Sequence, residues 1–235
     1  KAVFDCAMAG CDTIWLTCPK DMQPLIRERL GDYIVDPHVY YTTSKFANYP
    51  TVKEIPIYYV PSHPKDVGRR TSLSWSVITG AHNAWRVSRK ISRWVTPDKY
   101  FVSFPYGMFT SYYMGDHRAK IRSEQPFCLS YEGKSYKDGL FLPFTFGTQD
   151  YINVRKKFRS NEVRGCDKNM NYIKREDAYT GRFFAHDFIF GEIQDNNLCS
   201  VELPWYYDVS SWEGLKSWLA SDYSLDKPKD FILSY

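Results

Sequence analysis

The segment 69–107 constrains the fold more than any other stretch, because it joins one long amphipathic helix to one apolar strand. Pro97 ends the helical pattern, and 100–104 then carries aromatic and β-branched residues without polar alternation, as is typical of a strand buried in a parallel sheet. We therefore expect a helix from Ser72 that packs on such a sheet. Its core face at helical spacing would comprise Leu73, Val77, Ala81, Ala84, Val87 or Ser88, Ile91 and Val95.

The regions before and after this segment differ in pattern. Helical and strand-like stretches alternate before it, which is the signature of βα units: helices at 2–9 and 21–30, and strands at 12–18, 33–35 and 55–60, with a long loop at 37–53. After it we expect helices at 110–121, 148–159 and 210–219, and strands at 127–131, 140–146, 183–193 and 199–203. The sequence thus predicts one α/β domain over 1–235: an open mixed, mostly parallel sheet flanked by helices, with an antiparallel addition over about 123–200.

Composition bounds the partners and the compartment. The chain has 235 residues, 43% of them hydrophobic, which is enough for a proper core. With 31 basic and 27 acidic residues the net charge of +4 gives no argument for a nucleic-acid partner. No apolar run approaches the ~20 residues of a membrane span. The six cysteines form no CxxC pair and indicate a reduced, cytoplasmic protein.

Two positions in the first half of the chain suit anions or ligands. Arg69 and Arg70 stand beside the expected helix start at Ser72, where free backbone N–H groups favour phosphate. The strand 100–104 stops at 105–107, and ligands of open α/β sheets sit beyond the carboxyl ends of strands. A solubility role for the two arginines is equally consistent with the sequence.

The same long helix carries basic residues on the face away from its core: Arg86, Arg89, Lys90 and Arg93. This pattern fits a surface for an anionic partner. A solvated helix face is the more common explanation, and composition alone favours it.

Asp208 is the candidate metal ligand. It follows a short strand and precedes a helix for which Ser210 and Glu213 predict a capping box. A carboxylate in this position can hold Mg²⁺ beside phosphates, and it can equally be a turn residue.

The order of these parts resembles the sugar-nucleotide nucleotidyltransferases, which have a GT-A-like fold. Residues 1–34 look like the family segment that begins at the lysine of its glycine-rich loop, and 72–76 (SLSWS) look like the helix start that cradles the base. The strand and turn at 100–107 take the place of the strand that ends in the first metal-binding acid. WYYDVSSWEGLKSWL, residues 205–219, is similar to the motif with the second acid, and Asp208 falls on that acid.

The resemblance implies a Mg²⁺-dependent transferase that makes a nucleotide-sugar from a nucleoside triphosphate and a sugar 1-phosphate. Lys1 would neutralise phosphate charge, Asp208 would hold Mg²⁺, and the nucleotide-binding residues would be Arg69, Arg70, Ser72, Ser74, Trp75, Tyr106 and Gly107. Asp208 should then lie close to 105–107.

The sequence departs from the family in three places, one of which is Trp75 at the position of the base-contacting polar residue. The first metal-binding acid is replaced by 105–107, and the family's first strand and glycine-rich loop are not in this sequence, so we expect them upstream of Lys1.

Two other function classes stay open. A glycosyltransferase of the same fold would use a nucleotide-sugar donor, and it usually carries an Asp-x-Asp at a strand end, which this sequence lacks. A non-catalytic protein could keep the fold for binding or assembly, with a protein partner or as an oligomer. The resemblance extends to open reading frames of tailed phages, which would place the protein in the cytoplasm of an infected bacterium.

Overall fold

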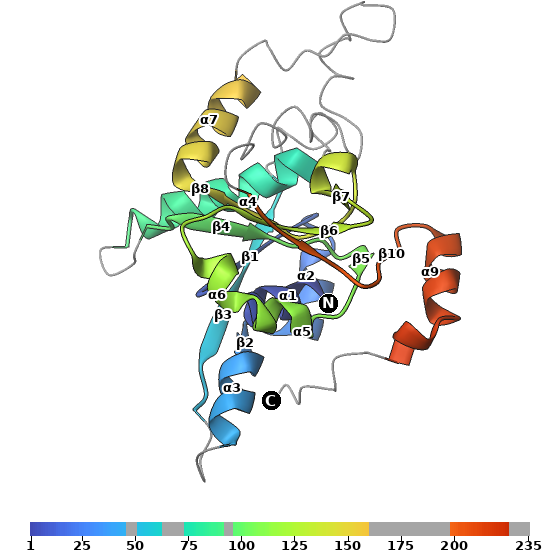
Figure 1. The fold of residues 1–235 in the computed structure, drawn as a ribbon. Helices are drawn as coiled ribbons and strands as arrows, with labels where there is room; N and C mark the ends of the chain where they lie inside the picture. Colours follow the sequence, from blue (N-terminus) through green and yellow to red (C-terminus); the bar gives the residue numbers. More distant parts are fainter. Residues whose placement is uncertain (46–50, 63–72, 92–95, 160–197, 226–235) are drawn as a thin grey trace, which may run out of the picture.

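The computed structural model describes residues 1–45, 51–62, 73–91, 96–159 and 198–225. In these residues the chain is a mixed α/β protein, with open sheets of mixed strand direction and helices packed around them (Figure 1). No helix of the described part is both long and apolar enough to cross a membrane.

The first sheet has the order β1-β3-β2. Strand β1 (Ile14–Cys18) runs parallel to β3 (Glu54–Pro61), and β2 (Tyr33–Val35) pairs antiparallel with β3 on its other side. Helix α1 (Ala2–Ala9) precedes β1 and ends at Gly10, whose φ of 87° is the left-handed conformation that favours glycine. Helix α2 (Gln23–Leu30) connects β1 to β2.

Helix α4 (Leu73–Ser88) covers β1. The Thr17 hydroxyl near the end of β1 donates a hydrogen bond of 3.1 Å to the Ser76 carbonyl in the first turn of α4. Gly80 lets α4 pack closely on β1, because a Cβ at this position would lie only 3.1 Å from the Thr17 hydroxyl. The first turn of α4 therefore lies at the carboxyl end of β1.

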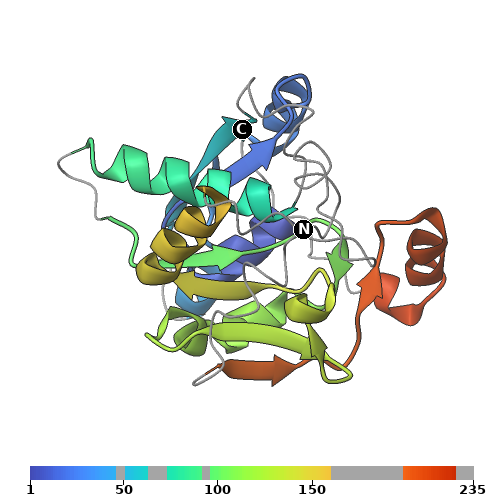
Figure 2. The ribbon, with the colours of Figure 1, turned by 90° about the horizontal axis from the view of Figure 1, so that it is seen from above.

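The second sheet has the order β4-β8-β6-β7, with β9 beside β6. Its strands are β4 (Lys99–Val102), β6 (Phe127–Tyr131), β7 (Lys134–Ser135), β8 (Phe144–Gly147) and β9 (Cys199–Glu202). Strand β9 is parallel to β6, whereas β8 is antiparallel to both β4 and β6. Figure 2 shows α4 and α7 (Thr148–Arg159) side by side over the β4–β8 pair.

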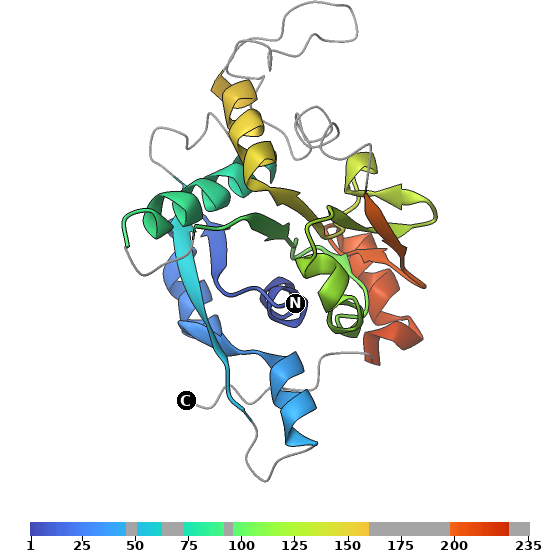
Figure 3. The ribbon, with the colours of Figure 1, turned by 60° about the vertical axis from the view of Figure 1, so that its left-hand side comes forward.

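A short ribbon completes the described strands. Strand β5 (Gly107–Met108) pairs antiparallel with β10 (Tyr207–Asp208), which leads into α9 (Trp212–Leu219) and the 3-10 helix η3 (Asp222–Leu225). The other short elements are α3 (Pro37–Ser44), α5 (Tyr112–Asp116), α6 (Arg118–Arg122) and the 3-10 helix η1 (Tyr136–Asp138). Figure 3 looks along α1, which lies between the first sheet and the α5–α6 pair.

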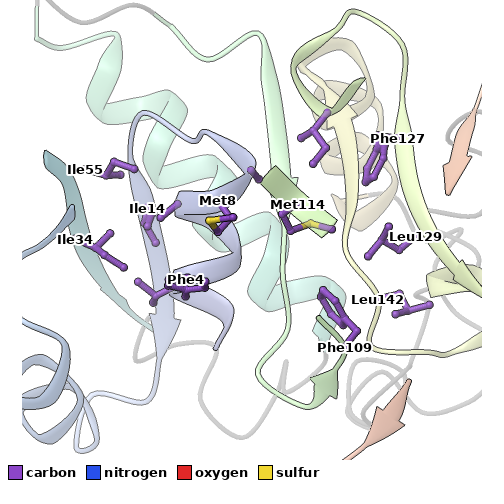
Figure 4. Packing of buried hydrophobic residues seen from close by; sticks show 14 of the residues in the cluster. Phe4, Met8, Ile14, Ile34, Ile55, Phe109, Met114, Phe127, Leu129 and Leu142 are labelled. Carbon is purple, nitrogen blue, oxygen red and sulfur yellow. The ribbon is translucent and has the colours of Figure 1, made fainter. Parts of the chain in front are cut away.

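The apolar core consists of two clusters. One joins α4 and α7 to β4 and β8 and includes the fully buried rings of Phe141, Phe144 and Tyr151. The other surrounds α1 and includes Met8 and Met114 (Figure 4). Strands β1 and β4 contribute to both clusters, so the two sheets share their core.

The mostly parallel sheet expected from the sequence is not confirmed, because five of the seven described strand pairs are antiparallel. The segment 100–104 forms β4 as an antiparallel neighbour of β8. Its two faces are covered all the same, because Tyr100 and Val102 belong to the cluster under α4 while Phe101 packs on the cluster around α1. Burial on both faces removes polar alternation whatever the strand direction, which is why the pattern was misleading.

Some expected element boundaries were also wrong. The supposed loop 37–53 begins with α3, because the Asp36 carboxylate caps the helix and Pro37 suits its first position. Ser211, and not Ser210, caps α9 by accepting a hydrogen bond from the Gly214 N–H. The expected strand at 183–193 lies outside the described residues.

Candidate functional site

Asp208 lies beside the strand end at 105–107, as expected from the sequence. The register of the ribbon places Asp208 opposite Gly107, and the Val209 N–H donates a 2.9 Å hydrogen bond to the Tyr106 carbonyl. The approach of the two segments, about one hundred residues apart in the chain, is therefore fixed by backbone hydrogen bonds.

Two glycines permit this arrangement. A Cβ at Gly107 would overlap the carbonyl oxygen of Phe141, and a Cβ at Gly214 would overlap the carbonyl oxygen of Asp208. Tyr206 holds the same region from the other side, because its hydroxyl accepts a 3.0 Å hydrogen bond from the Phe141 N–H. Larger side chains at either glycine would push the ribbon away from its supports.

The Asp208 carboxylate is exposed and has one defined partner. Its Oδ1 accepts a 2.8 Å hydrogen bond from the Ser210 N–H, which shapes the turn into α9. A carboxylate has acceptor capacity for about four bonds, so the turn leaves room for a cation. Asp208 is thus a turn former, as one of the two sequence-based interpretations predicted, and its exposed carboxylate keeps the metal-ligand role a prediction.

Lys1 is engaged in a buried ion pair. Its ammonium nitrogen lies 2.6 and 2.7 Å from the two carboxylate oxygens of Asp5, one turn later in α1, and Asp5 is fully buried. The Ser103 hydroxyl donates a 3.3 Å hydrogen bond to the same carboxylate. Burial lowers the pKa of Lys1, although the charge of Asp5 works in the opposite direction.

The ion pair and the ribbon belong to one region. The Lys1 ammonium lies 3.6 Å from the centre of the Phe109 ring, and Phe109 follows directly after β5. The segment 103–109 after β4 therefore touches the Lys1–Asp5 pair through Ser103 and Phe109, and it pairs with Asp208 through Gly107. Tyr106 is there as well, 42% exposed, with its ring centre 5.2 Å from that of Phe141.

The remaining predicted nucleotide-binding residues are only partly placed. Ser74 is fully buried in the first turn of α4, and Trp75 beside it packs on the cluster that contains Phe104. Arg69, Arg70 and Ser72 lie outside the described residues, so the basic loop is not tested.

Sequence reasoning missed three contributors to this region: Asp5, Ser103 and Phe109. Asp5 could have been found, because a lysine and an aspartate four residues apart on a helix face each other. No local sequence pattern indicates Ser103 and Phe109, because only the fold brings Ser103 to Asp5 and Phe109 to Lys1.

The metal-binding capacity of the described residues is limited. They contain no group of three or more His, Cys, Asp or Glu side chains that could hold a metal ion. Asp208 alone fits an ion such as Mg²⁺ that keeps several waters and takes further ligands from phosphates. A pocket of about 410 Å³ lies elsewhere, and its lining residues include His38, Tyr41 and Lys45 from the α3 segment and Tyr112, Gly115 and Asp116 from α5.

The cysteines were expected to be free, and those of the described residues are. Cys6, Cys11, Cys18, Cys128 and Cys199 are all free thiols, and Cys166 lies outside the described residues.

Comparison with known proteins gives no family assignment. No protein-family model matches the sequence, and no curated protein matches it significantly. The chemistry of the region must therefore be argued from its own residues.

Proposed function

We propose that the protein is a Mg²⁺-dependent nucleotidyltransferase that joins a nucleoside triphosphate to a sugar 1-phosphate, with release of pyrophosphate. The β5–β10 ribbon carries the proposal, because it pairs the exposed Asp208 with Gly107, in the turn region that follows β4 in the chain. A strand end with an adjacent acid is a suitable place for the phosphates of a nucleotide.

Phosphoryl chemistry of this kind depends on positioning and on charge neutralisation rather than on a protein nucleophile. Asp208 would hold Mg²⁺, which neutralises phosphate charge when bound. Lys1 would contribute a second positive charge, in competition with Asp5, its partner at 2.6 Å. Tyr106 and Gly107 would border the nucleotide, and Ser74 and Trp75 would support the base from the first turn of α4.

The finer fold assignment, a GT-A-like sheet, belongs to the same proposal. Two features support it: the parallel β1–β3 pair covered by α4, and the antiparallel β8 beside β4. Among the described strands, β1 pairs only with β3 and β4 pairs only with β8. Each of β1 and β4 thus has one edge without a described partner strand. One further strand paired with both of these edges would join the two sheets into one open sheet.

Calorimetric titration with each nucleoside triphosphate, with and without Mg²⁺, tests the proposal. Asp208→Asn keeps the shape and the turn hydrogen bond, so it should weaken Mg²⁺-dependent binding by about tenfold or more while leaving metal-free binding unchanged. The control variant Asp21→Asn removes the same charge from an exposed turn that is distant from Asp208 in the sequence, and it should bind triphosphate like the wild type. The proposal fails if the wild type binds no triphosphate, or if the two variants behave alike.

A second candidate function rests on the Lys1–Asp5 pair. Both oxygens of Asp5 already neutralise the ammonium, and Asp208 is a single acid, so the region also suits a non-catalytic binding or assembly protein. Triphosphate binding with no pyrophosphate released in the presence of any sugar 1-phosphate would favour this alternative.

A further inference from the structure

A basic surface lies across α4 and α7, away from the ribbon. We call it the α4–α7 basic surface and define it by His82, Trp85, Arg86, Arg89 and Lys90 from the α4 segment and Arg155 and Lys156 from α7. Arg86, Arg89, Lys90 and Lys156 are exposed, and the other three are partly buried. The two helices pack directly on each other (Figure 2).

Contacts between side chains fix the two halves of the surface. A 2.7 Å hydrogen bond joins His82 Nδ1 to the hydroxyl of Tyr151, which is itself buried. The rings of His82 and Trp85 stack with centres 6.2 Å apart. Because α7 presents Arg155 one turn after Tyr151, this hydrogen bond also sets the position of Arg155 relative to Trp85.

Two guanidinium groups lie over the Trp85 ring. The Arg89 group is 4.8 Å and the Arg155 group 5.9 Å from the centre of the Trp85 ring. A guanidinium that rests on an aromatic ring is already oriented, so it loses less conformational freedom when its N–H groups bind an anion. The tryptophan therefore holds two arginines from different helices ready for anionic groups.

None of the five cations of this surface forms an ion pair within the described part of the chain. Basic residues near a helix C-terminus stabilise the helix dipole, and this explains Arg86 and Arg89. It does not explain Arg155, which lies within α7. An unneutralised cluster on two helices is better explained by an anion that covers both.

The surroundings favour phosphates over a protein or a lipid partner. Among the described residues, large exposed apolar side chains lie on other elements, for example Leu25 on α2 and Trp212 and Leu219 on α9, and Ile91 is the one that follows α4. A protein interface needs an apolar centre, and an interfacial helix needs apolar anchors. A strip of cations with partly exposed aromatic rings instead fits a nucleic-acid strand, whose phosphates pair with Arg and Lys and whose bases stack on rings.

We propose that the α4–α7 basic surface binds single-stranded nucleic acid without sequence preference: Arg86, Arg89, Lys90, Arg155 and Lys156 would pair with phosphates, and the exposed part of the Trp85 ring would contact bases. The overall charge of +4 hides this surface, because it averages over 31 basic and 27 acidic residues. The inference does not depend on nucleotidyl transfer.

Fluorescence anisotropy with labelled DNA and RNA strands of about 16 nucleotides, titrated over a range of salt, measures the binding. Affinity should fall linearly with salt on logarithmic axes. The double variant Arg89→Gln/Arg155→Gln should lose about tenfold in affinity, and its salt slope should fall by about 1 to 2. Arg86→Gln/Lys156→Gln, at two exposed positions, should give the same result without disturbing Trp85.

Arg29→Gln/Lys20→Gln removes two exposed cations from another part of the molecule and should bind like the wild type. A thermal unfolding curve of each variant tests whether it is folded before its binding is compared with the wild type. Absence of binding by the wild type at low salt overturns the proposal, as does an equal loss in the control. Tighter binding of duplex DNA, of polyglutamate or of anionic vesicles would assign the surface to another partner and equally refute it.

Discussion

Replacing Asp36 by asparagine should break the buried ion pair that links β2 and α3 to α6. Asp36 follows β2, caps α3 through a 3.2 Å hydrogen bond from the Val39 N–H, and forms a two-pronged ion pair with Arg118 of α6, at 2.9 and 2.6 Å. Its side chain is fully buried, and that of Arg118 is 13% exposed. Asparagine keeps nearly the same shape and can still cap α3, so the change isolates the ion pair.

The cost follows from the charge that remains. Removing one partner of a buried ion pair destabilises proteins by about 3–5 kcal/mol, because the other charge stays buried without compensation. Since Arg118 retains some exposure, we expect about 3 kcal/mol for Asp36→Asn. Asp36→Ala should cost about 1 kcal/mol more, because the helix cap is lost as well.

Urea unfolding followed by circular dichroism measures these differences at neutral pH. A double-mutant cycle with Arg118→Met supplies the control, because the methionine removes the stranded charge. The double variant should be more stable than the sum of the two single effects predicts, by about 1–3 kcal/mol.

The effect should also depend on pH. Burial opposes ionisation of Asp36, but the hydrogen bonds from Arg118 and Val39 outweigh it and hold its pKa below the ordinary value of 3.8. The stabilisation is therefore present above about pH 4 and is lost as the pH falls through the lowered pKa. A difference between wild type and Asp36→Asn below about 1 kcal/mol, or one that does not shrink on acidification, would refute the assignment of a buried, stabilising pair.

Three further predictions concern stability and can be checked by the same unfolding measurement. Tyr100→Phe should raise stability by about 1 kcal/mol, because the buried Tyr100 hydroxyl has no hydrogen-bond partner among the described residues; a loss of similar size would reveal a missed partner. Lys99→Met should cost about 2–3 kcal/mol, since the Lys99 ammonium donates to the carbonyls of Ile121, Ser123 and Gln125, each at 2.6 Å, and an unchanged stability would contradict this. Gly107→Ala should cost about 2 kcal/mol or more, because its Cβ overlaps the Phe141 carbonyl oxygen, whereas Gly133→Ala, with nothing near its Cβ, should cost less despite its positive φ.

Local signals predicted individual elements well. Helix α1 ends at Gly10 and α7 spans Thr148–Arg159, as their periodicity and termini indicated. Strand direction was not predictable, because the apolar run of β4 looks the same in parallel and antiparallel sheets. Helix α3 was predictable in principle from Asp36 and Pro37, but its polar, tyrosine-rich sequence resembles a loop.

The candidate site shows the same division. The proximity of Asp208 to Gly107 was expected from the family resemblance, although no local pattern could give the pairing itself. The pairing of Lys1 with Asp5 and the hydrogen bond from Ser103 to Asp5 were missed, and Ser103 reaches Asp5 only through the packing of β4 against α1. The basic surface likewise needed the contact between His82 and Tyr151, which joins two helices distant in sequence.

The β5–β10 ribbon has a consequence for how the protein folds. Gly107 pairs with Asp208, so about one hundred residues must be synthesised between the two halves of the candidate site. Contacts across long chain separations form late, because the entropy of closing the intervening loop is lost before they contribute stability. We therefore expect the two sheets to form first and the ribbon to dock afterwards. During synthesis, Asp208 leaves the ribosome late. A nascent chain in which Asp208 is still inside the ribosome would already be largely folded and would still lack its candidate site.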